Sequence, residues 1–210
     1  MTRLKPFSLL GAGLLGLGLT LAAVSHAAEP AVQLLPVGQM TTFDVLKDGI
    51  SAYSRRDYAQ AQKVLTPLAK SGNITARYML ASMQLNARPP QPAGEAEMLK
   101  LAQEGHIGAM RDLGKLYYIV KNPPQIAEAQ KWLTEAAQRS DTESQNMLGV
   151  LYLKGEGGIQ PDPVQAYMWL SLAAERGDAA SGLMLENERY FTAAIRTEGA
   201  TRARQWKPVR

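Results

Sequence analysis

Few side chains in this sequence could carry nucleophilic or acid–base chemistry. The 210 residues include two histidines and no cysteine, which excludes disulfides, thiolate catalysis and thiolate metal sites. One histidine, His26, lies in an N-terminal segment that we expect to be cleaved, so the mature chain keeps only His106. A nucleophile–histidine pair built on His106 stays open, but no nucleophile-elbow motif accompanies it. His106 follows Gly105 at a predicted helix end, and we interpret it as a residue that starts the next helix.

Aspartate and glutamate are the remaining candidates for catalysis. A glycosidase of the two-carboxylate type needs only these residue types, so a cell-wall- or glycan-directed enzyme stays open as an alternative. Most of the acidic residues, however, recur at predicted helix caps or at exposed helix positions. A single histidine among scattered carboxylates also gives little basis for a metal site. We therefore predict a protein that is not an enzyme and that binds neither a metal ion nor a cofactor.

The elements that must position these residues repeat along the chain. Four anchor residues share the same neighbours. Three positions before each anchor is an alanine, seven positions before it is an apolar residue, and eight positions after it is a leucine. The anchors, at spacings of 33, 35 and 37, are Gly72, Gly105, Ser140 and Gly177. The leucines are Leu80, Leu113, Leu148 and Leu185. Columns that stay in register over four periods indicate a repeat architecture.

Each period contains two helical patterns separated by turn residues. Apolar residues recur at i, i+3, i+4 and i+7, which is the stripe of an amphipathic helix. The glycines among the anchors can adopt the left-handed backbone conformation that commonly ends a helix. At the remaining anchor we expect a capping box formed by Ser140 and Glu143. Helix pairs this short cannot bury their stripes alone, so neighbouring pairs must stack. The pattern predicts an all-α fold, an α-solenoid of antiparallel helix pairs over residues 42–210, with about four pairs and a C-terminal cap.

The two ends of the array differ from its middle. We expect the first helix over Thr42 to Arg55, and its inward-facing residues are Leu46, Ile50 and Tyr53. At the far end, Glu186 and Glu188 interrupt the apolar columns, which is typical of the polar outer face of a cap. Trp206 is expected to cover the last helix pair.

One stretch carries a family resemblance. Residues Leu148 to Asp178 read LGVLYLKGEGGIQPDPVQAYMWLSLAAERGD and resemble a complete Sel1-like repeat (SLR), a relative of the tetratricopeptide repeat. The Leu-Gly-x-x-Tyr start, the glycine-rich loop and the Ala-x-x-Trp-Leu segment all match, and weaker copies extend the resemblance over roughly 42–206. The resemblance implies a superhelical adaptor or assembly scaffold, often in bacterial envelopes. The helix-pair disulfides of cysteine-rich relatives linked to β-lactam binding have no counterpart here.

The resemblance also implies where a partner protein would bind. In tetratricopeptide proteins the concave groove is lined by non-core positions of the first helix of each pair. The residues at those positions that we expect to contact a partner are Tyr78, Arg111, Lys115, Tyr118 and Asn146.

The N-terminal segment indicates export. Arg3 and Lys5 precede an uncharged stretch from Ser8 to Val24, and Ser25-His26-Ala27 places small residues before a cut that leaves Ala28 first. We expect a signal peptide over 1–27, an extended leader over 28–41, and a mature protein in the periplasm without stable membrane insertion. Loss of the signal lowers the net charge from +4 to +2. A balance so close to neutral does not indicate a nucleic-acid partner, and the oligomeric state stays open.

Overall fold

The computed structural model of the chain describes residues 41–87 and 90–209. These residues form ten α-helices and one π-helical turn, and they contain no strand. The elements are α1 (Thr42–Ser54), α2 (Tyr58–Lys70), α3 (Ile74–Leu85), α4 (Pro92–Gln103), α5 (Ile107–Lys115), η1 (Leu116–Val120), α6 (Ile126–Gln138), α7 (Thr142–Lys154), α8 (Pro163–Glu175), α9 (Ala179–Leu185) and α10 (Ala193–Gln205). The predicted signal peptide and all of the leader except residue 41 lie outside the described residues.

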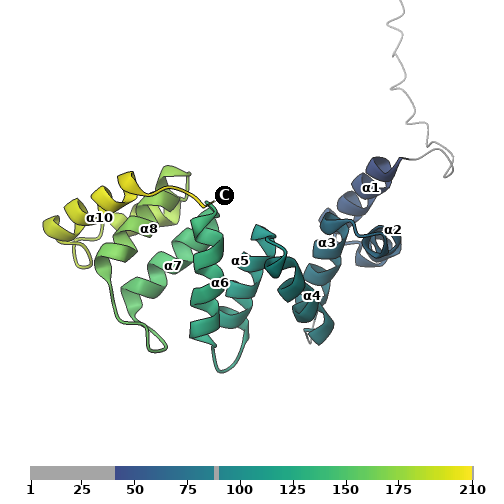
Figure 1. The fold of residues 1–210 in the computed structure, drawn as a ribbon, viewed down its shortest axis with the longest axis horizontal. Helices are drawn as coiled ribbons and strands as arrows, with labels where there is room; N and C mark the ends of the chain where they lie inside the picture. The colour runs from purple at the N-terminus through teal and green to yellow at the C-terminus, as the bar shows by residue number, and fades with distance from the viewer. Residues whose placement is uncertain (1–40, 88–89, 210) are drawn as a thin grey trace, which may run out of the picture. The chain divides into compact units, whose positions relative to one another are not determined.

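Each helix packs against the next one along the chain. Contacts within a pair join α1 to α2, α3 to α4, α5 to α6 and α7 to α8, and similar contacts join each pair to the following one (Figure 1). We call the first helix of each pair its A helix, and the A helices are α1, α3, α5 with η1, α7 and α9. The predicted all-α solenoid of antiparallel helix pairs is confirmed.

The A helices begin with a shared cap. The N-cap side chains of Asn73, His106, Asp141 and Asp178 each accept a hydrogen bond from the backbone N–H three residues later. His106 does so through Nδ1, 3.1 Å from Ala109 N. The interpretation of His106 as a helix-start residue is therefore confirmed.

The residue before each cap turns the chain through the left-handed region. Gly72, Gly105 and Gly177 have φ values of 90°, 93° and 92°, and Ser140 has a φ of 70°. Ser140 therefore occupies the glycine position, and Asp141 is the N-cap. The expected capping box at Ser140 and Glu143 is wrong, because the serine lies one residue too early to cap the helix.

The core lies between the two helices of each pair. The apolar residue seven before each anchor is fully buried at all four positions, namely Leu65, Met98, Leu133 and Leu170. Opposite them, the backbone of the A helix comes close. A Cβ added at Gly114 would lie 2.6 Å from the Leu133 side chain, and one at Gly149 would lie 2.7 Å from Leu170. The glycine in the Leu-Gly-x-x-Tyr motif thus permits close helix packing.

The first helix packs differently from the prediction. Gly49 and Ala52 are its buried residues, whereas Ile50 is 39% exposed, and Leu46 and Tyr53 are only partly buried. The reason is that, among the described residues, α1 packs only against helices that follow it, α2 and α3.

The last helix doubles back onto the array. Helix α10 packs against α8, and the Trp206 ring lies edge-on to the Trp169 ring at 6.1 Å between centroids. Beyond it, Val209 N donates a hydrogen bond to the carbonyl of Gln138. Trp206 therefore covers the last helix pair, as predicted.

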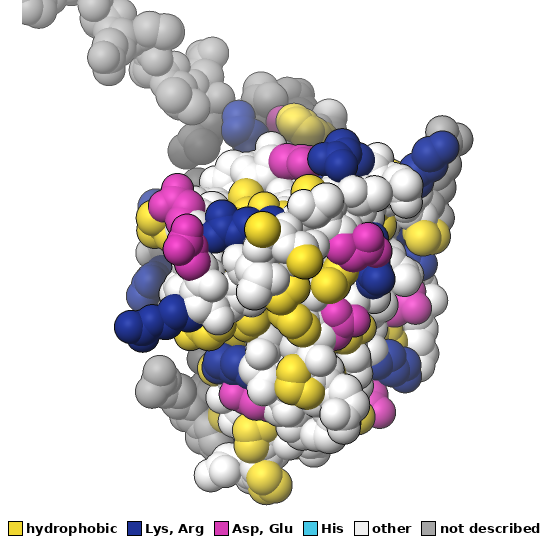
Figure 2. Space-filling model, turned by 90° about the vertical axis from the view of Figure 1, so that its left-hand side faces the viewer, with side chains coloured by type: hydrophobic (Ala, Val, Ile, Leu, Met, Phe, Trp, Pro, Cys, Tyr) yellow, Lys and Arg dark blue, Asp and Glu magenta, His cyan; other side chains and the backbone are white. Residues whose placement is uncertain are grey.

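The outer face of this end is not uniformly polar. Glu186 and Glu188 are exposed as expected, but Leu183 and Tyr190 are 71% and 48% exposed. Figure 2 shows this end of the molecule, where hydrophobic side chains lie between charged ones. The prediction of a polar cap is therefore only partly right.

Candidate partner-binding surface

A hollow opens between the A helices of the first three pairs. It has a volume of about 310 Å³, and we call it the A-face groove. Its walls come from α1, α3, α5 and η1, and its lining residues are Tyr53, Tyr78, Ser82, Leu85, Asn86, Asp112, Lys115, Leu116 and Val120. An apolar side formed by leucine and valine thus faces a polar side of hydroxyl, amide and charged groups, a mixture typical of binding sites.

The groove continues past its apolar side. Leu85, Leu116 and Val120 also line a second hollow of about 240 Å³, whose far wall includes Glu95 and Lys121. Lys121 Nζ lies 2.7 Å from the Glu95 carboxylate, so the charges of this wall neutralise each other. The shared side chains give the two hollows a common apolar surface.

Tyr78 is fixed in the wall of the groove. Its hydroxyl donates to Asp112 at 2.8 Å and accepts a hydrogen bond from Arg111 at 3.0 Å, and its ring stacks on His106 at 4.5 Å. Burial, followed by the charge of Asp112, raises the pKa of the Tyr78 hydroxyl above its ordinary value. Tyr78 therefore presents a neutral, well-positioned aromatic edge.

Arg111 and Lys115 share a network of carboxylates. Arg111 lies 3.1 Å from Asp112, 3.3 Å from Asp141 and 3.4 Å from Glu143. Lys115 Nζ lies 2.7 Å from the same Glu143 carboxylate and stays 40% exposed. Arg111 thus ties α5 to the start of α7, whereas Lys115 keeps N–H donors available at the groove.

The other two predicted contact residues do not line the groove. The Tyr118 hydroxyl donates to Glu156 at 3.1 Å, and Asn146 donates to Asp178 at 3.1 Å and to Ser181 at 2.8 Å. Both side chains connect neighbouring repeats. Of the five predicted residues, the structure brings together Tyr78, Arg111 and Lys115, and only Tyr78 and Lys115 line the groove.

A family model matches the centre of the chain. The Sel1 repeat model fits residues 107–141 and 142–178, which correspond to α5–α6 and α7–α8. The chain contains two Sel1 repeats. No curated protein matches the sequence.

Solved structures with Sel1-like repeats share the fold. A Sel1 repeat protein from Oxalobacter formigenes is 23% identical, with a TM-score of 0.61, over 77% of this chain and 67% of that chain. A protective antigen of uropathogenic Escherichia coli strains, described as having an SLR fold, is 24% identical with a TM-score of 0.60. That match covers 70% of this chain but 32% of the antigen, so the chain spans about a third of the antigen's length. The Sel1 repeat fold typically serves as a protein-interaction scaffold.

Several groove residues were not predicted from the repeat columns. Tyr53 was expected in the core, and Asn86 and Val120 were not singled out. Val120 belongs to the π-helical turn η1, which inserts a residue relative to an α-helix and so shifts its position. A signal for Tyr53 was present, because it occupies the same column as Leu85 and Tyr118, twelve residues after each N-cap.

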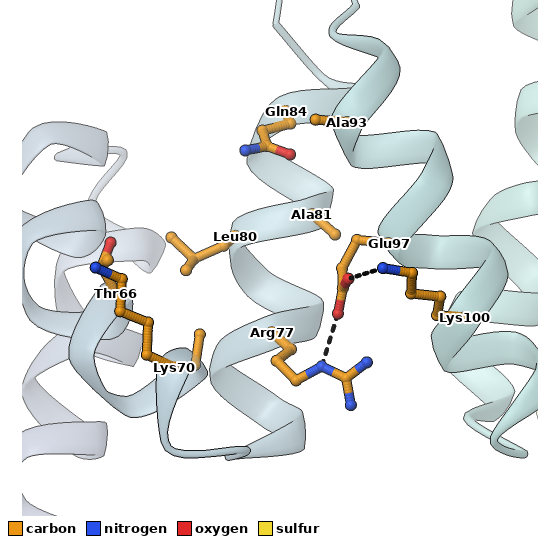
Figure 3. Close-up of a pocket in the computed structure, with 10 residues that line it drawn as sticks. Thr66, Lys70, Arg77, Leu80, Ala81, Gln84, Ala93, Glu97 and Lys100 are labelled. Atoms are coloured by element: carbon orange, nitrogen blue, oxygen red, sulfur yellow. Dashed lines mark hydrogen bonds and ion pairs between the residues drawn. The ribbon is translucent and has the colours of Figure 1, made fainter.

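A larger hollow lies elsewhere, among α2, α3 and α4. It has a volume of about 470 Å³, and Figure 3 shows Arg77 and Glu97 meeting across it. Arg77 lies 2.6 Å from Glu97 and 2.8 Å from Glu104. These ion pairs hold α3 against α4, and none of the five predicted contact residues lines this hollow.

In the five principal hollows of residues 41–87 and 90–209, no two carboxylates line the same cavity. Each of the five principal hollows of the described residues is lined by at most one carboxylate, whether Asp112, Glu95 or Glu97. Two-carboxylate glycosidases place both groups in one site. Within the same residues, no group of three or more histidine, aspartate or glutamate side chains could hold a metal ion. None of the described helices is long and apolar enough to cross a membrane.

Proposed function

We propose that this chain is a protein-interaction scaffold of the cell envelope and that it binds a segment of a partner protein in the A-face groove. The observation that carries the proposal is the groove itself, which combines an apolar surface with Lys115, Asn86 and Ser82 on its other side. A peptide segment offers both kinds of group, because its side chains fill apolar hollows and its backbone needs donors and acceptors. The Sel1 repeats supply a rigid frame for this surface.

The envelope location rests on the N-terminal residues. The basic start, the uncharged stretch and the small residues before Ala28 are the features that a secretory signal peptide requires. We expect the mature protein in the periplasm, with Ala28 as its first residue. Fractionation followed by N-terminal sequencing tests this, and an uncut chain in the cytoplasm would contradict it.

The partner-binding test uses neighbouring residues as a matched pair. Val120 is 55% exposed and lines the groove, whereas Ile119 is 66% exposed and does not. We expect Val120→Asp, combined with Lys115→Glu, to reduce crosslinked recovery of the partner from the envelope at least tenfold. Ile119→Asp introduces the same charge as Val120→Asp does, one residue away, and should leave recovery within about twofold.

The readout separates binding from folding. The groove variant and the Ile119 variant should keep a helical circular dichroism and a urea midpoint close to those of the wild type, because none of the three substituted side chains is in the core. Proteins recovered with the wild type and the Ile119 variant, but lost with the groove variant, are the groove ligands. Equal recovery with all three chains would reject the groove as the binding surface.

A further inference from the structure

One side chain in each of α3, α5 and α7 reaches forward to the next repeat. It is the fifth residue after the N-cap, and we call it the linking residue. The Tyr78 ring stacks on His106 at 4.5 Å, Arg111 lies 3.3 Å from Asp141, and Asn146 Nδ2 lies 3.1 Å from Asp178. In all three junctions the residue that it contacts is the N-cap of the following A helix.

In two of these junctions the linking residue also lies close to the second residue after that cap. At Gly108, an added Cβ would lie 3.3 Å from the Tyr78 hydroxyl oxygen, and the Glu143 carboxylate lies 3.4 Å from Arg111 Nε. The repeat geometry therefore brings the fifth position of one A helix to the cap and the second position of the next one. This rule holds for polar and aromatic linking residues alike.

Among the described residues, one residue at these positions at each end of the array has no residue of a neighbouring repeat to contact. The residue at the linking position of α9 is Leu183, and within residues 41–87 and 90–209 no further A helix follows α9. The second residue after the cap of α1 is Phe43, and α1 is the first helix of the part of the chain that the structure describes. These are the two most exposed large hydrophobic side chains of the described residues, at 71% for Leu183 and 73% for Phe43. Helices α1 and α10 lie at opposite ends of the row of helices (Figure 1).

The charges of the two end helices are complementary. In a continued array, α1 of a second copy would follow α9 and approach the end of the row that α9 and α10 form, although α10 packs on α8 rather than on α9. Helix α10 carries three arginines and one glutamate, a net charge of +2. Helix α1 carries Asp44, Asp48 and Lys47, a net charge of −1. The polar surface of α10 thus fits a charged neighbour and a reversible contact.

We propose that the chain associates head to tail with further copies of itself, so that Leu183 of one copy packs against Phe43 of the next. This contact is heterologous, with different surfaces on its two sides, and it therefore builds open rows unless the rotation closes a ring. Burial of two large apolar side chains drives it, and the attraction between α10 and α1 orients it. The A-face groove lies outside this junction. The self-association therefore does not depend on the proposed partner.

The test compares the wild type with two variants that each disable one end. The average mass of the purified wild-type protein, measured by light scattering or sedimentation, should rise with concentration beyond that of a dimer. Phe43→Asp and Leu183→Asp should each remain monomeric, with an association constant at least tenfold lower. Ile74→Asp, at a side chain that is 52% exposed but outside both ends, should associate as the wild type does.

Mixing the two variants gives the deciding result. The Phe43 variant keeps a functional C-terminal end and the Leu183 variant keeps a functional N-terminal end, so an equimolar mixture should form a dimer and nothing larger. A monomeric wild type at every concentration would overturn the proposal. Self-association of either single variant would also overturn it, because it would show a contact between like ends. A purely monomeric mixture would do the same, provided that circular dichroism shows both variants folded.

Discussion

His106 joins two repeats through one ring. Its Nδ1 atom accepts the hydrogen bond from Ala109 N that starts α5, while the ring face stacks on Tyr78 of the preceding repeat. Burial lowers the pKa of His106 below the ordinary histidine value of 6.5, although the nearby Asp112 opposes the shift. The cap therefore depends on a neutral imidazole, because a protonated Nδ1 cannot accept a hydrogen bond.

We predict that this cap makes the protein sensitive to acid. Since the unfolded chain binds a proton at His106 more readily than the folded one, stability falls as the pH drops through 6.5 and below. His106→Asn places at this position the N-cap residue that α3 already uses. Between about pH 7.5 and about pH 5, the stability of the Asn variant relative to the wild type should rise by about 1 kcal/mol.

Urea unfolding at the two pH values measures this difference. Carboxylates titrate in both chains and largely cancel in the comparison, so a change in the gap reports on His106. A stability gap that stays constant with pH would show that the imidazole does not act as a neutral cap.

At the scale of the helix pair, small residues decide how closely the two helices approach. Eight residues after each N-cap stand Gly49, Ala81, Gly114 and Gly149, all of which are buried. The equivalent position in α9 is Glu186, which lies beyond the helix and is exposed. The column ends where the close pairing ends, because α10 packs on α8 instead.

Two glycine-to-alanine substitutions should therefore have opposite signs. Alanine favours a helix interior over glycine by about 1 kcal/mol, and Gly182 in α9 has open space around an added Cβ. Gly182→Ala should stabilise the protein by about 0.5–1 kcal/mol. At Gly149 the Cβ would lie 2.7 Å from Leu170 Cγ in a fully buried core, and overpacking should outweigh the propensity gain and cost about 1–2 kcal/mol net. Urea midpoints that shift in the same direction would contradict this explanation.

The repeat columns predict the fold better than they predict the groove. Columns such as Leu133 and Leu170 are apolar because every pair buries them in the same way, so their spacing is visible in the sequence. A polar column such as Tyr78, Arg111 and Asn146 shows only that the position is not core. Whether its side chains contact a partner or the next repeat depends on the distance between helices, which the pattern does not contain. The structure shows that these three contact the next repeat.

At the scale of the whole molecule, each repeat depends on its neighbours alone. Among the described residues, substantial packing joins helices adjacent in the row, apart from the return of α10 onto α8. Stability in such an array is a sum of repeat and junction contributions rather than one global quantity. The C-terminal end is held by further contacts. The Trp206 ring contacts Trp169 and Arg176, and the backbone N–H of Val209 donates a hydrogen bond to the carbonyl of Gln138.

Removing the Trp206 side chain should destabilise the C-terminal end of the array and leave the N-terminal end unchanged. Trp206→Ala deletes the ring that covers α8, and we expect a local loss of about 2 kcal/mol, less than the about 3–5 kcal/mol for truncating a fully buried tryptophan. Hydrogen exchange followed by mass spectrometry should show faster exchange in α8 and α10, with the rates of α3 and α4 unchanged. Arg202→Ala, at an exposed side chain of the same helix, serves as the control and should alter neither end. Faster exchange in α3 and α4 of the Trp206 variant would mean that the helix pairs unfold as one unit.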